Sequence, residues 1–354
     1  MPLTLPVPAK LALAVLLIVA SQYHRWSRLS SGSVFAPEFP RAIVILFNWA
    51  FGTILLLAVL QLLLDLGTLG AVLVRRGEVD VPDVVRYAIA GIAAALAGVG
   101  VANAVRIPPV KHLEVAIRGL PSQFDGYRVL QLTDLHLSRL FPAAWARAVV
   151  ERANTADVDL VVVTGDFIDG SVAMRRSDVA PLHHLRAPDG VYAVPGNHEY
   201  FFDYRAWCQA LAQLGMRMLL NSHVVLQRGG AQLTLAGVTD LSAPAAGEVG
   251  PDLDAALAGA PKGAPVILLD HQPRRARRAA ARGIALQLSG HTHGGMIAGL
   301  DRLVARANDG FVSGRYDVDG MTLYVSNGTG LWPGFAVRLG RPSELTRIVL
   351  RAAE

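Results

Sequence analysis

The sequence has few of the residues on which several common classes of protein depend. Its 354 residues include one cysteine, Cys208, which excludes a disulfide framework and a thiolate metal site. Charged residues make up only 17% of the chain, aromatic residues 7% and hydrophobic residues 52%. We find no internal repeat and no low-complexity tract beyond alanine-rich patches typical of helices. A chain this poor in charge is not an ordinary soluble protein, so we expect a membrane region.

Basic residues outnumber acidic residues in this chain. The formal net charge is +5 and the isoelectric point about 9.6. A basic balance favours anionic partners such as phosphates, nucleic acid or a lipid surface, but does not choose among them.

Two long stretches near the start contain no charged side chain. Residues 42–64 would form a helix about 34 Å long, enough to cross a hydrocarbon core of about 30 Å. Its only polar residues are Asn48, Thr53 and Gln61. Residues 87–105 are also uncharged and rich in glycine and alanine, which lets a neighbouring helix approach closely. Both stretches predict transmembrane helices, with helices buried in a soluble protein as the alternative.

The first apolar stretch, residues 11–20, is short for a membrane span. It fits the core of a signal peptide, with a passable cleavage site at residues 18–20. We prefer a span that is lengthened by Lys10 at one end and by Tyr23 and Trp26 at the other. We therefore expect a multi-pass membrane region at residues 1–108, with two or three helices, followed by a second domain at residues 109–354.

The second domain has the alternation of an α/β protein. Helical stretches are expected at 143–153, 204–214, 252–258 and 273–281. Short apolar runs typical of buried strands cover residues 113–117, 127–133, 159–163, 191–194, 232–238, 266–269, 285–289, 322–326 and 345–350.

Five of these runs are followed within about three residues by oxygen or imidazole side chains. Ligands at the ends of strands converge on one crevice in an open α/β sheet. Oxygen and imidazole ligands without sulfur suit Mn, Fe, Zn or Ni. Each fragment alone is common in solvated loops, but five of the right chemistry in this order predict a site for two divalent metals that share a carboxylate. The fragments are Asp134-Leu135-His136, Gly165-Asp166 with Asp169, Gly196-Asn197-His198-Glu199, His271, and Gly290-His291-Thr292-His293-Gly294.

The series resembles the calcineurin-like metallophosphoesterase superfamily, in which these five motifs occur in the same order. All five are complete here, and the resemblance covers about residues 113–350. The runs 126–136 and 338–342 further resemble a membrane-associated bacterial branch, which is placed near phosphodiesterases and lipid-A-precursor pyrophosphate hydrolases. The resemblance implies a four-layer α/β/β/α sandwich. The sequence departs from the family pattern at two positions: Asp270 stands where serine is frequent, and Asn327 where arginine is frequent. Asn327 bears on contacts to the distal group of the substrate, and so on fine specificity.

The resemblance also implies a role for each motif residue. His198 would face the scissile phosphate, and Asp169 would hydrogen-bond to it and orient it. Asp166 would bridge the two metals. The remaining ligands would be Asp134, His136 and His293 at one metal and Asn197, His271 and His291 at the other.

The implied reaction is hydrolysis of a phosphodiester or pyrophosphate bond, and a lipid-linked molecule is one candidate substrate. A metal-bridging hydroxide would attack phosphorus, and His198 would stabilise the phosphate and act as the acid. One alternative is a nuclease of the same superfamily, although we see no accessory domain for gripping a duplex. Another is a membrane receptor or scaffold that uses the metal site only to bind a ligand. The oligomeric state is not predicted.

The side of the membrane follows from the basic residues next to the expected spans, because lysine and arginine favour cytoplasmic flanks. Residues 25–41 and the catalytic domain share one side, which holds Arg25, Arg28, Arg41, Arg106 and Lys111. The other side holds Arg75, Arg76 and Arg86, joined by Lys10 if there are three spans. The count predicts a cytoplasmic catalytic domain.

Overall fold

The computed structural model describes residues 5–353, which divide into two compact units. The helical unit comprises the chain up to Val105 together with Pro333–Leu339. The sheet unit comprises Arg106–Trp332 and Gly340–Glu354. The division at Val105 lies three residues before the boundary expected at residue 108, and the return of Pro333–Leu339 to the helices has no counterpart in the sequence-based division.

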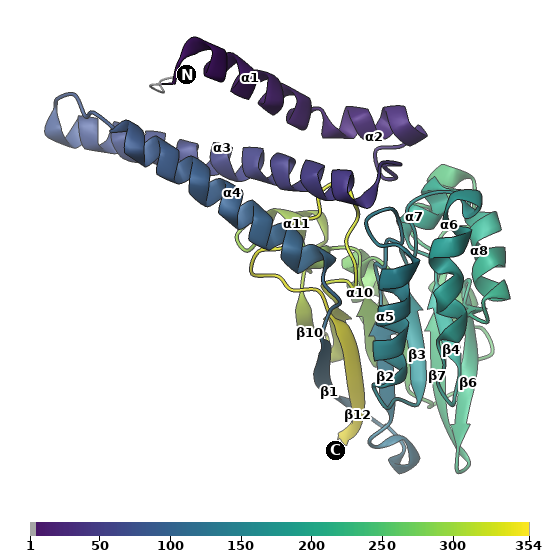
Figure 1. Cartoon of the computed structure of the whole chain (residues 1–354). Helices are drawn as coiled ribbons and strands as arrows, with labels where there is room; N and C mark the ends of the chain where they lie inside the picture. The colour runs from purple at the N-terminus through teal and green to yellow at the C-terminus, as the bar shows by residue number, and fades with distance from the viewer. Residues whose placement is uncertain (1–4, 354) are drawn as a thin grey trace. The chain divides into compact units, whose positions relative to one another are not determined.

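Four helices make up most of the helical unit (Figure 1). They are α1 (Val7–Ser21), α2 (Tyr23–Ser31), α3 (Arg41–Arg75) and α4 (Asp83–Val105). The two uncharged stretches lie within α3 and α4, and both helices are long and apolar enough to cross a membrane. The pair α1 and α2 passes the same test when taken together, with a bend of 52° between its halves. The helical unit therefore offers two candidate spans, or three.

Small residues let α3 and α4 approach each other. The Trp49 indole on α3 donates a hydrogen bond of 2.9 Å to the Ala94 carbonyl on α4. A Cβ atom at Gly98 would lie only 3.7 Å from that indole nitrogen, whereas one at Gly91 would meet nothing within 4 Å. The close approach expected from the glycine and alanine spacing therefore occurs at Gly98 and not at Gly91.

The sheet unit contains two six-stranded sheets. The first has the order β1-β12-β2-β3-β4-β5, and β2 to β5 run parallel. The second has the order β10-β11-β9-β8-β7-β6, with β11, β9, β8 and β7 parallel. The strands of the first sheet are β1 (Val110–Arg118), β2 (Arg128–Leu132), β3 (Leu160–Thr164), β4 (Val191–Val194), β5 (Arg217–Met218) and β12 (Leu345–Ala353). Those of the second are β6 (Ser222–Arg228), β7 (Ala231–Gly237), β8 (Val266–Leu269), β9 (Leu286–Ser289), β10 (Gly314–Val318) and β11 (Met321–Val325).

Alternate residues of these strands build two kinds of core. Val129, Leu160 and Val162 point into the layer between the sheets, where they meet side chains such as Leu235 and Leu288 of the second sheet. Their neighbours point the opposite way because side chains alternate along a strand. Each sheet therefore buries both faces, as its nearly continuous apolar strands require.

Helices cover the outer face of each sheet, which completes four layers (Figure 1). On the first sheet they are α5 (Ala143–Asn154), α6 (Val172–Val179) and α8 (Tyr204–Gln213). On the second, α9 (Leu253–Leu257) and α10 (Ala276–Ala280) pack against side chains such as Val238, Leu268 and Leu323. Two short helices, α7 (Asn197–Phe201) and α11 (Asp301–Ala307), lie in the loops that follow the strands. The predicted α/β/β/α fold is confirmed.

Candidate metal centre

The loops that follow the parallel strands have a strained backbone. Five of the predicted site residues have positive φ angles, which cost non-glycine residues roughly 1–2 kcal/mol each. Strain of this kind is concentrated at functional sites, where the surrounding structure holds it in place. The five are Asp134 (φ 53°), His136 (46°), Asp166 (55°), His291 (70°) and His293 (51°).

The glycines of the motifs are explained by close approach rather than by flexibility. A Cβ atom at Gly196 would lie 2.2 Å from Oδ1 of Asp166, and one at Gly290 would lie 2.2 Å from Oδ2 of Asp134. Any larger residue at these two positions would therefore displace the carboxylate beside it.

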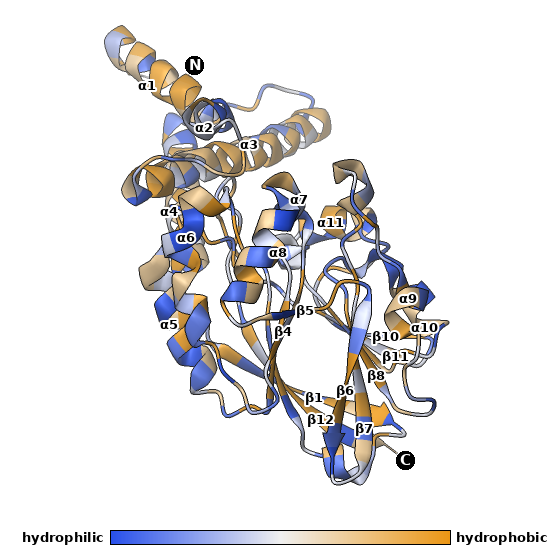
Figure 2. Ribbon diagram, turned by 90° about the vertical axis from the view of Figure 1, so that its right-hand side faces the viewer, coloured by the Kyte–Doolittle hydropathy of each residue, from blue (hydrophilic) through white to orange (hydrophobic). Residues whose placement is uncertain are grey.

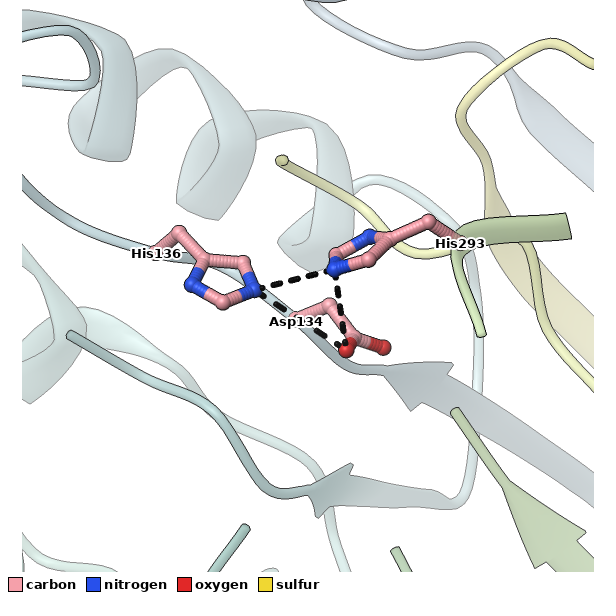
Figure 3. A group of neighbouring side chains, drawn as sticks. All are labelled: Asp134, His136 and His293. Carbon is pink, nitrogen blue, oxygen red and sulfur yellow. Dashed lines mark hydrogen bonds and ion pairs between the residues drawn. The ribbon is translucent and has the colours of Figure 1, made fainter. Parts of the chain in front are cut away.

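Asp134, His136 and His293 form the first donor group (Figure 3). The two imidazole Nε2 atoms lie 3.2 Å apart, and Oδ1 of Asp134 lies 4.0 Å from that of His136 and 3.7 Å from that of His293. Backbone and side-chain donors fix the carboxylate: the His291 amide lies 3.1 Å from each oxygen, and the Thr133 hydroxyl donates to Oδ2 over 2.8 Å. The group is buried in the sheet unit.

Asp166, Asn197, His271 and His291 form the second donor group. Nε2 of His271 lies 3.2 Å from Oδ2 of Asp166 and 3.1 Å from Oδ1 of Asn197. Nδ1 of His291 lies 2.9 Å from the same Asn197 oxygen. The four side chains come from the ends of β3, β4, β8 and β9, and thus from both sheets.

The Asp166 carboxylate lies between the two groups. Its Oδ2 is 3.7 Å from Nε2 of His136 on one side and 3.2 Å from Nε2 of His271 on the other. Its Oδ1 accepts a 2.9 Å hydrogen bond from the His198 amide. Burial opposes the charge of Asp166, but the imidazoles of His271 and His198 outweigh it and hold the pKa of this carboxyl well below its ordinary value.

Hydrogen bonds set the orientation of the imidazole rings. Nδ1 of His271 lies 2.7 Å from the Thr164 carbonyl oxygen, which can only accept, so Nδ1 carries the proton. Nδ1 of His136 donates to Oδ2 of Asp169 over 3.1 Å in the same manner. Both rings therefore present Nε2 to the centre of the site, as metal-binding histidines do.

His198 shares Asp169 with His136. Its Nδ1 lies 2.5 Å from Oδ1 of Asp169, and its Nε2 lies 3.9 Å from Oδ2 of Asp166. Burial favours the neutral ring, but the charges of Asp166 and Asp169 outweigh it and raise the pKa of His198 to about 9. The distances alone also allow His198 to join His136 and Asp166 as a ligand. Its separate role as the acid stays a prediction.

Glu199 organises the loops beneath the centre. Its Oε2 accepts hydrogen bonds from the amides of Gly196 at 2.7 Å and Asp166 at 3.0 Å, and its Oε1 accepts one from Phe167 at 2.8 Å. Burial and the charge of Asp166 raise the pKa of Glu199 to about 8. A cation beside Asp166 would lower this repulsion and favour the ionised Glu199 that the three amides require.

Two fully buried residues that the motifs do not include hold the Asp169 loop. Nε of Arg175 donates to the Asp169 carbonyl over 2.7 Å, and the Trp207 indole donates to the Gly170 carbonyl over 3.0 Å. A Cβ atom at Gly170 would lie 2.9 Å from Nε of Arg175. Sequence reasoning missed both residues, because each lies on a helix covering the first sheet and carries no motif.

The donor chemistry fits divalent cations. Nε2 of His271, Oδ2 of Asp166 and Oδ1 of Asn197 converge, and all three are acceptors once Nδ1 of His271 carries the proton. Such a convergence requires either an added proton or a cation. Burial first, and then repulsion from Asp166, raises the pKa of Asp134 against the pull of His271, which a nearby cation would relieve.

The structure thus brings all nine predicted site residues together, while their individual roles stay predictions. The structure also gives the surroundings of Asn327 and Asp270, the two positions at which the sequence departs from the family pattern. Asn327 accepts a hydrogen bond of 2.6 Å from the Ser313 hydroxyl and donates one of 3.1 Å to the Pro342 carbonyl. Burial, and then the charge of Asp240, raises the pKa of Asp270 to about 7.

Comparisons with known proteins support the same interpretation. A family model described as calcineurin-like phosphoesterase matches residues 127–295. A transmembrane protein with metallophosphoesterase domain from Danio rerio is 36% identical over 274 residues, which are 74% of this chain and 62% of that protein. An uncharacterized metallophosphoesterase from Bacillus subtilis, YkuE, is 30% identical over 59% of this chain and 73% of its own.

The matches also have limits of extent. The chain spans about three fifths of the length of the transmembrane relatives, at 62% for Danio rerio and 60% for Bos taurus. Among solved structures, a sulfate thiohydrolase from Thermus thermophilus aligns with a TM-score of 0.40 and 17% identity, over 66% of this chain and 57% of its own.

Proposed function

The chain belongs to the calcineurin-like phosphoesterase family, and we propose that it is a membrane-anchored phosphoesterase that works with two divalent metal ions. The observation that carries the proposal is the position of Asp166 between two buried donor groups. One carboxylate shared by two cations is a recurring arrangement for hydrolysing phosphate esters.

The residues present would hold both ions. Asp134, His136 and His293 would bind one, Asn197, His271 and His291 the other, and Asp166 would bridge them. When bound, the two cations supply a hydroxide nucleophile near neutral pH and offset the charge of the phosphoryl oxygens. Mn, Fe, Zn and Ni all suit these ligands.

His198 would supply the proton in this reaction. Its Nδ1 is held by Asp169, which leaves Nε2 directed at the centre of the site. A protonated ring there can stabilise a phosphoryl oxygen and donate to the leaving oxygen, a step that contributes about 10²–10⁴-fold. The pKa of about 9 keeps the ring protonated at neutral pH, and a bound cation beside Asp166 would lower that value.

We propose a phosphodiester or pyrophosphate bond as the target, with a lipid-linked substrate as the finer proposal. The helices support the lipid part, because a membrane-anchored enzyme meets substrates in the membrane surface. The test is turnover of a panel by metal-loaded, full-length protein: artificial phosphodiesters, phosphomonoesters, a nucleotide-diphospho-lipid and a DNA duplex. Preferred cleavage of the duplex would favour the nuclease, and binding without any turnover would favour a receptor or scaffold.

The membrane anchor is proposed from the exposure of apolar side chains on the helices. Leu62 is 58% exposed, Leu73 69% and Val74 84%, and Figure 2 colours most of α3 as hydrophobic. Patches of this size need a cover, which for helices of this length and composition is lipid. We therefore propose a multi-pass arrangement in which α3 and α4 are two spans and the bent pair α1 and α2 is a third.

We propose a cytoplasmic location for the catalytic domain, and the basic residues beside the expected spans support it. Fusions of alkaline phosphatase after Ala104 and within residues 75–86 test this. We expect activity only from the second fusion, because that enzyme needs an exported location. Activity from the fusion after Ala104 would place the catalytic domain outside, while the enzymatic proposal would be unaffected.

A further inference from the structure

The longest helix of the helical unit, α3, contains one buried polar side chain, and that side chain binds a distant part of the chain. Asn48 on α3 is 1% exposed. Its amide nitrogen donates to the carbonyls of Val44 and Pro333, both at 2.9 Å, and its oxygen accepts from the Ala336 amide at 2.5 Å. The Tyr23 hydroxyl donates to the same Pro333 carbonyl over 2.7 Å.

Two glycines, one on α3 and one on α4, make room for the same segment. Val337 is fully buried. A Cβ atom at Gly52 of α3 would lie 2.9 Å from its Cγ2, and one at Gly100 of α4 would lie 2.5 Å from its Cγ1. The Arg338 amide donates to the Gly100 carbonyl over 2.9 Å. The backbone of Pro333–Leu339 is thus held by hydrogen bonds to α2, α3 and α4, and its Val337 side chain fits against a glycine of α3 and a glycine of α4.

The chain just before this segment packs on the metal centre. In the sheet unit, the amide of Thr329 donates to the Thr133 carbonyl and that of Gly330 to the Asp134 carbonyl, both at 2.8 Å. A Cβ atom at Gly328 would lie 3.0 Å from Nδ1 of His293. The loop Gly328–Thr329–Gly330 therefore supports the backbone of the first donor group.

Only Leu331 and Trp332 separate this loop from Pro333, and three residue steps span about 11 Å at most. A tether this short limits how far Pro333 can move away from Gly330, so a displacement of Pro333–Leu339 that stretches it would pull on Gly330. Such a displacement would disturb the backbone of Asp134 and the ring of His293, and both residues are proposed ligands of the same metal.

We propose that the grip of α3 and α4 on Pro333–Leu339 positions the first donor group, so that the membrane helices tune metal binding as well as anchoring the enzyme. The inference rests on the proposed metal-dependent function. Asn48, Gly100 and Val337 are positioning residues in this scheme and touch neither metal nor substrate.

The test is a pair of compensating substitutions in the full-length protein, purified in detergent and stripped of metal. Gly100→Ala places a methyl group against Val337, so we expect affinity for Mn²⁺ to fall by about 10-fold or more, the range seen when residues supporting ligands are changed. Adding Val337→Ala removes the clashing methyl group and should restore most of the affinity. Gly91→Ala on the same helix meets open space and should leave Mn²⁺ binding unchanged.

A second variant covers the case in which Gly100→Ala fails to fold. Asn48→Leu removes the hydrogen bonds to Pro333 and Ala336. Gln61→Leu is its control, because the Gln61 amide donates to Asp65 of its own helix. We expect Asn48→Leu to weaken Mn²⁺ binding and to speed proteolysis within residues 333–339, with kcat reduced and KM unchanged. Wild-type Mn²⁺ affinity in folded Gly100→Ala or Asn48→Leu protein would overturn the proposal. Because Mn²⁺ affinity is measured without a substrate, this test can be interpreted even if no hydrolysis is found.

Discussion

The two units of this protein differ in the residues that they bury. In the sheet unit, large apolar side chains such as Leu130 and Leu160 are fully buried. In the helical unit, Leu62 and Leu73 are more than half exposed, while the buried positions of α3 and α4 include Asn48, Gly52 and Gly100. Water drives apolar side chains inward, whereas helices in lipid associate through small residues and hydrogen bonds. The difference indicates two solvents for one chain.

The units also differ in how they treat charge. The sheet unit buries three carboxylates, Asp134, Asp166 and Asp169, within a cluster of imidazoles. Residues 42–64 of α3 contain no charged side chain at all. Buried carboxylates that repel one another indicate a cation site, so the chemistry is assigned to the sheet unit and the anchoring to the helices.

The largest effect is expected from Asp166→Asn, which tests whether metal binding and hydrolysis belong to the sheet unit and anchoring to the helices. The amide keeps the shape of the side chain but loses the charge between the two donor groups. We expect metal content to fall at both positions and hydrolysis to be abolished, while the protein still extracts with the membrane fraction. Elemental analysis measures the metal. Two full equivalents in an active Asp166→Asn protein would end the assignment.

His198→Ala should produce the next largest effect. Turnover should fall by about 10² or more, as for loss of a general acid, while most of the metal is retained. His183→Ala is the control, because His183 is exposed and outside the motifs. If His198→Ala instead loses its metals, His198 is a ligand and the division of roles is wrong.

A smaller effect is expected from Asp169→Asn, and it has a direction in pH. The charges of Asp166 and Asp169 raise the pKa of His198 to about 9 against the effect of burial. A protonated acid is present below its pKa and lost above it, so kcat should fall at alkaline pH. Removing the Asp169 charge lowers the pKa of His198, and the alkaline fall should move to lower pH. A kcat profile identical to that of the wild type would contradict the role given to Asp169.

The smallest effects are expected on stability, when leucine is replaced by alanine once in each unit. Leu130→Ala opens a cavity in the sheet unit and should cost about 2–5 kcal/mol of stability. Leu62→Ala changes a residue that is 58% exposed and should cost no more than about 0.5 kcal/mol in detergent. Thermal unfolding of the full-length protein measures both. Equal losses would show that Leu62 is covered by protein rather than by lipid.

Much of the sheet unit could be predicted because its signals are local. The runs 191–194 and 266–269 coincide with β4 and β8, since strands buried on both faces are continuously apolar. The donors could be found because they directly follow these strands. Asp169 was expected to hold His198, and the 2.5 Å contact between Oδ1 and Nδ1 agrees with that geometry.

Other features could not be predicted because their causes are not local. The strands β6 and β10 lie at the two edges of their sheet and carry polar residues such as His223 and Asp317, so neither is apolar along most of its length. Arg175 is fully buried next to Asp169, yet an arginine in a polar helix looks exposed. Asn48 stood out in an apolar stretch, but its partner Pro333 is 285 residues away.

The central claim is that the sheet unit uses bound metal to hydrolyse phosphate esters. The most direct test strips the full-length protein with a chelator and restores Mn²⁺ stepwise, while bound metal and hydrolysis of an artificial phosphodiester are measured in the same samples. We predict no hydrolysis without metal and a rise that is complete when two ions are bound per chain. Undiminished hydrolysis by the metal-free protein would contradict the account.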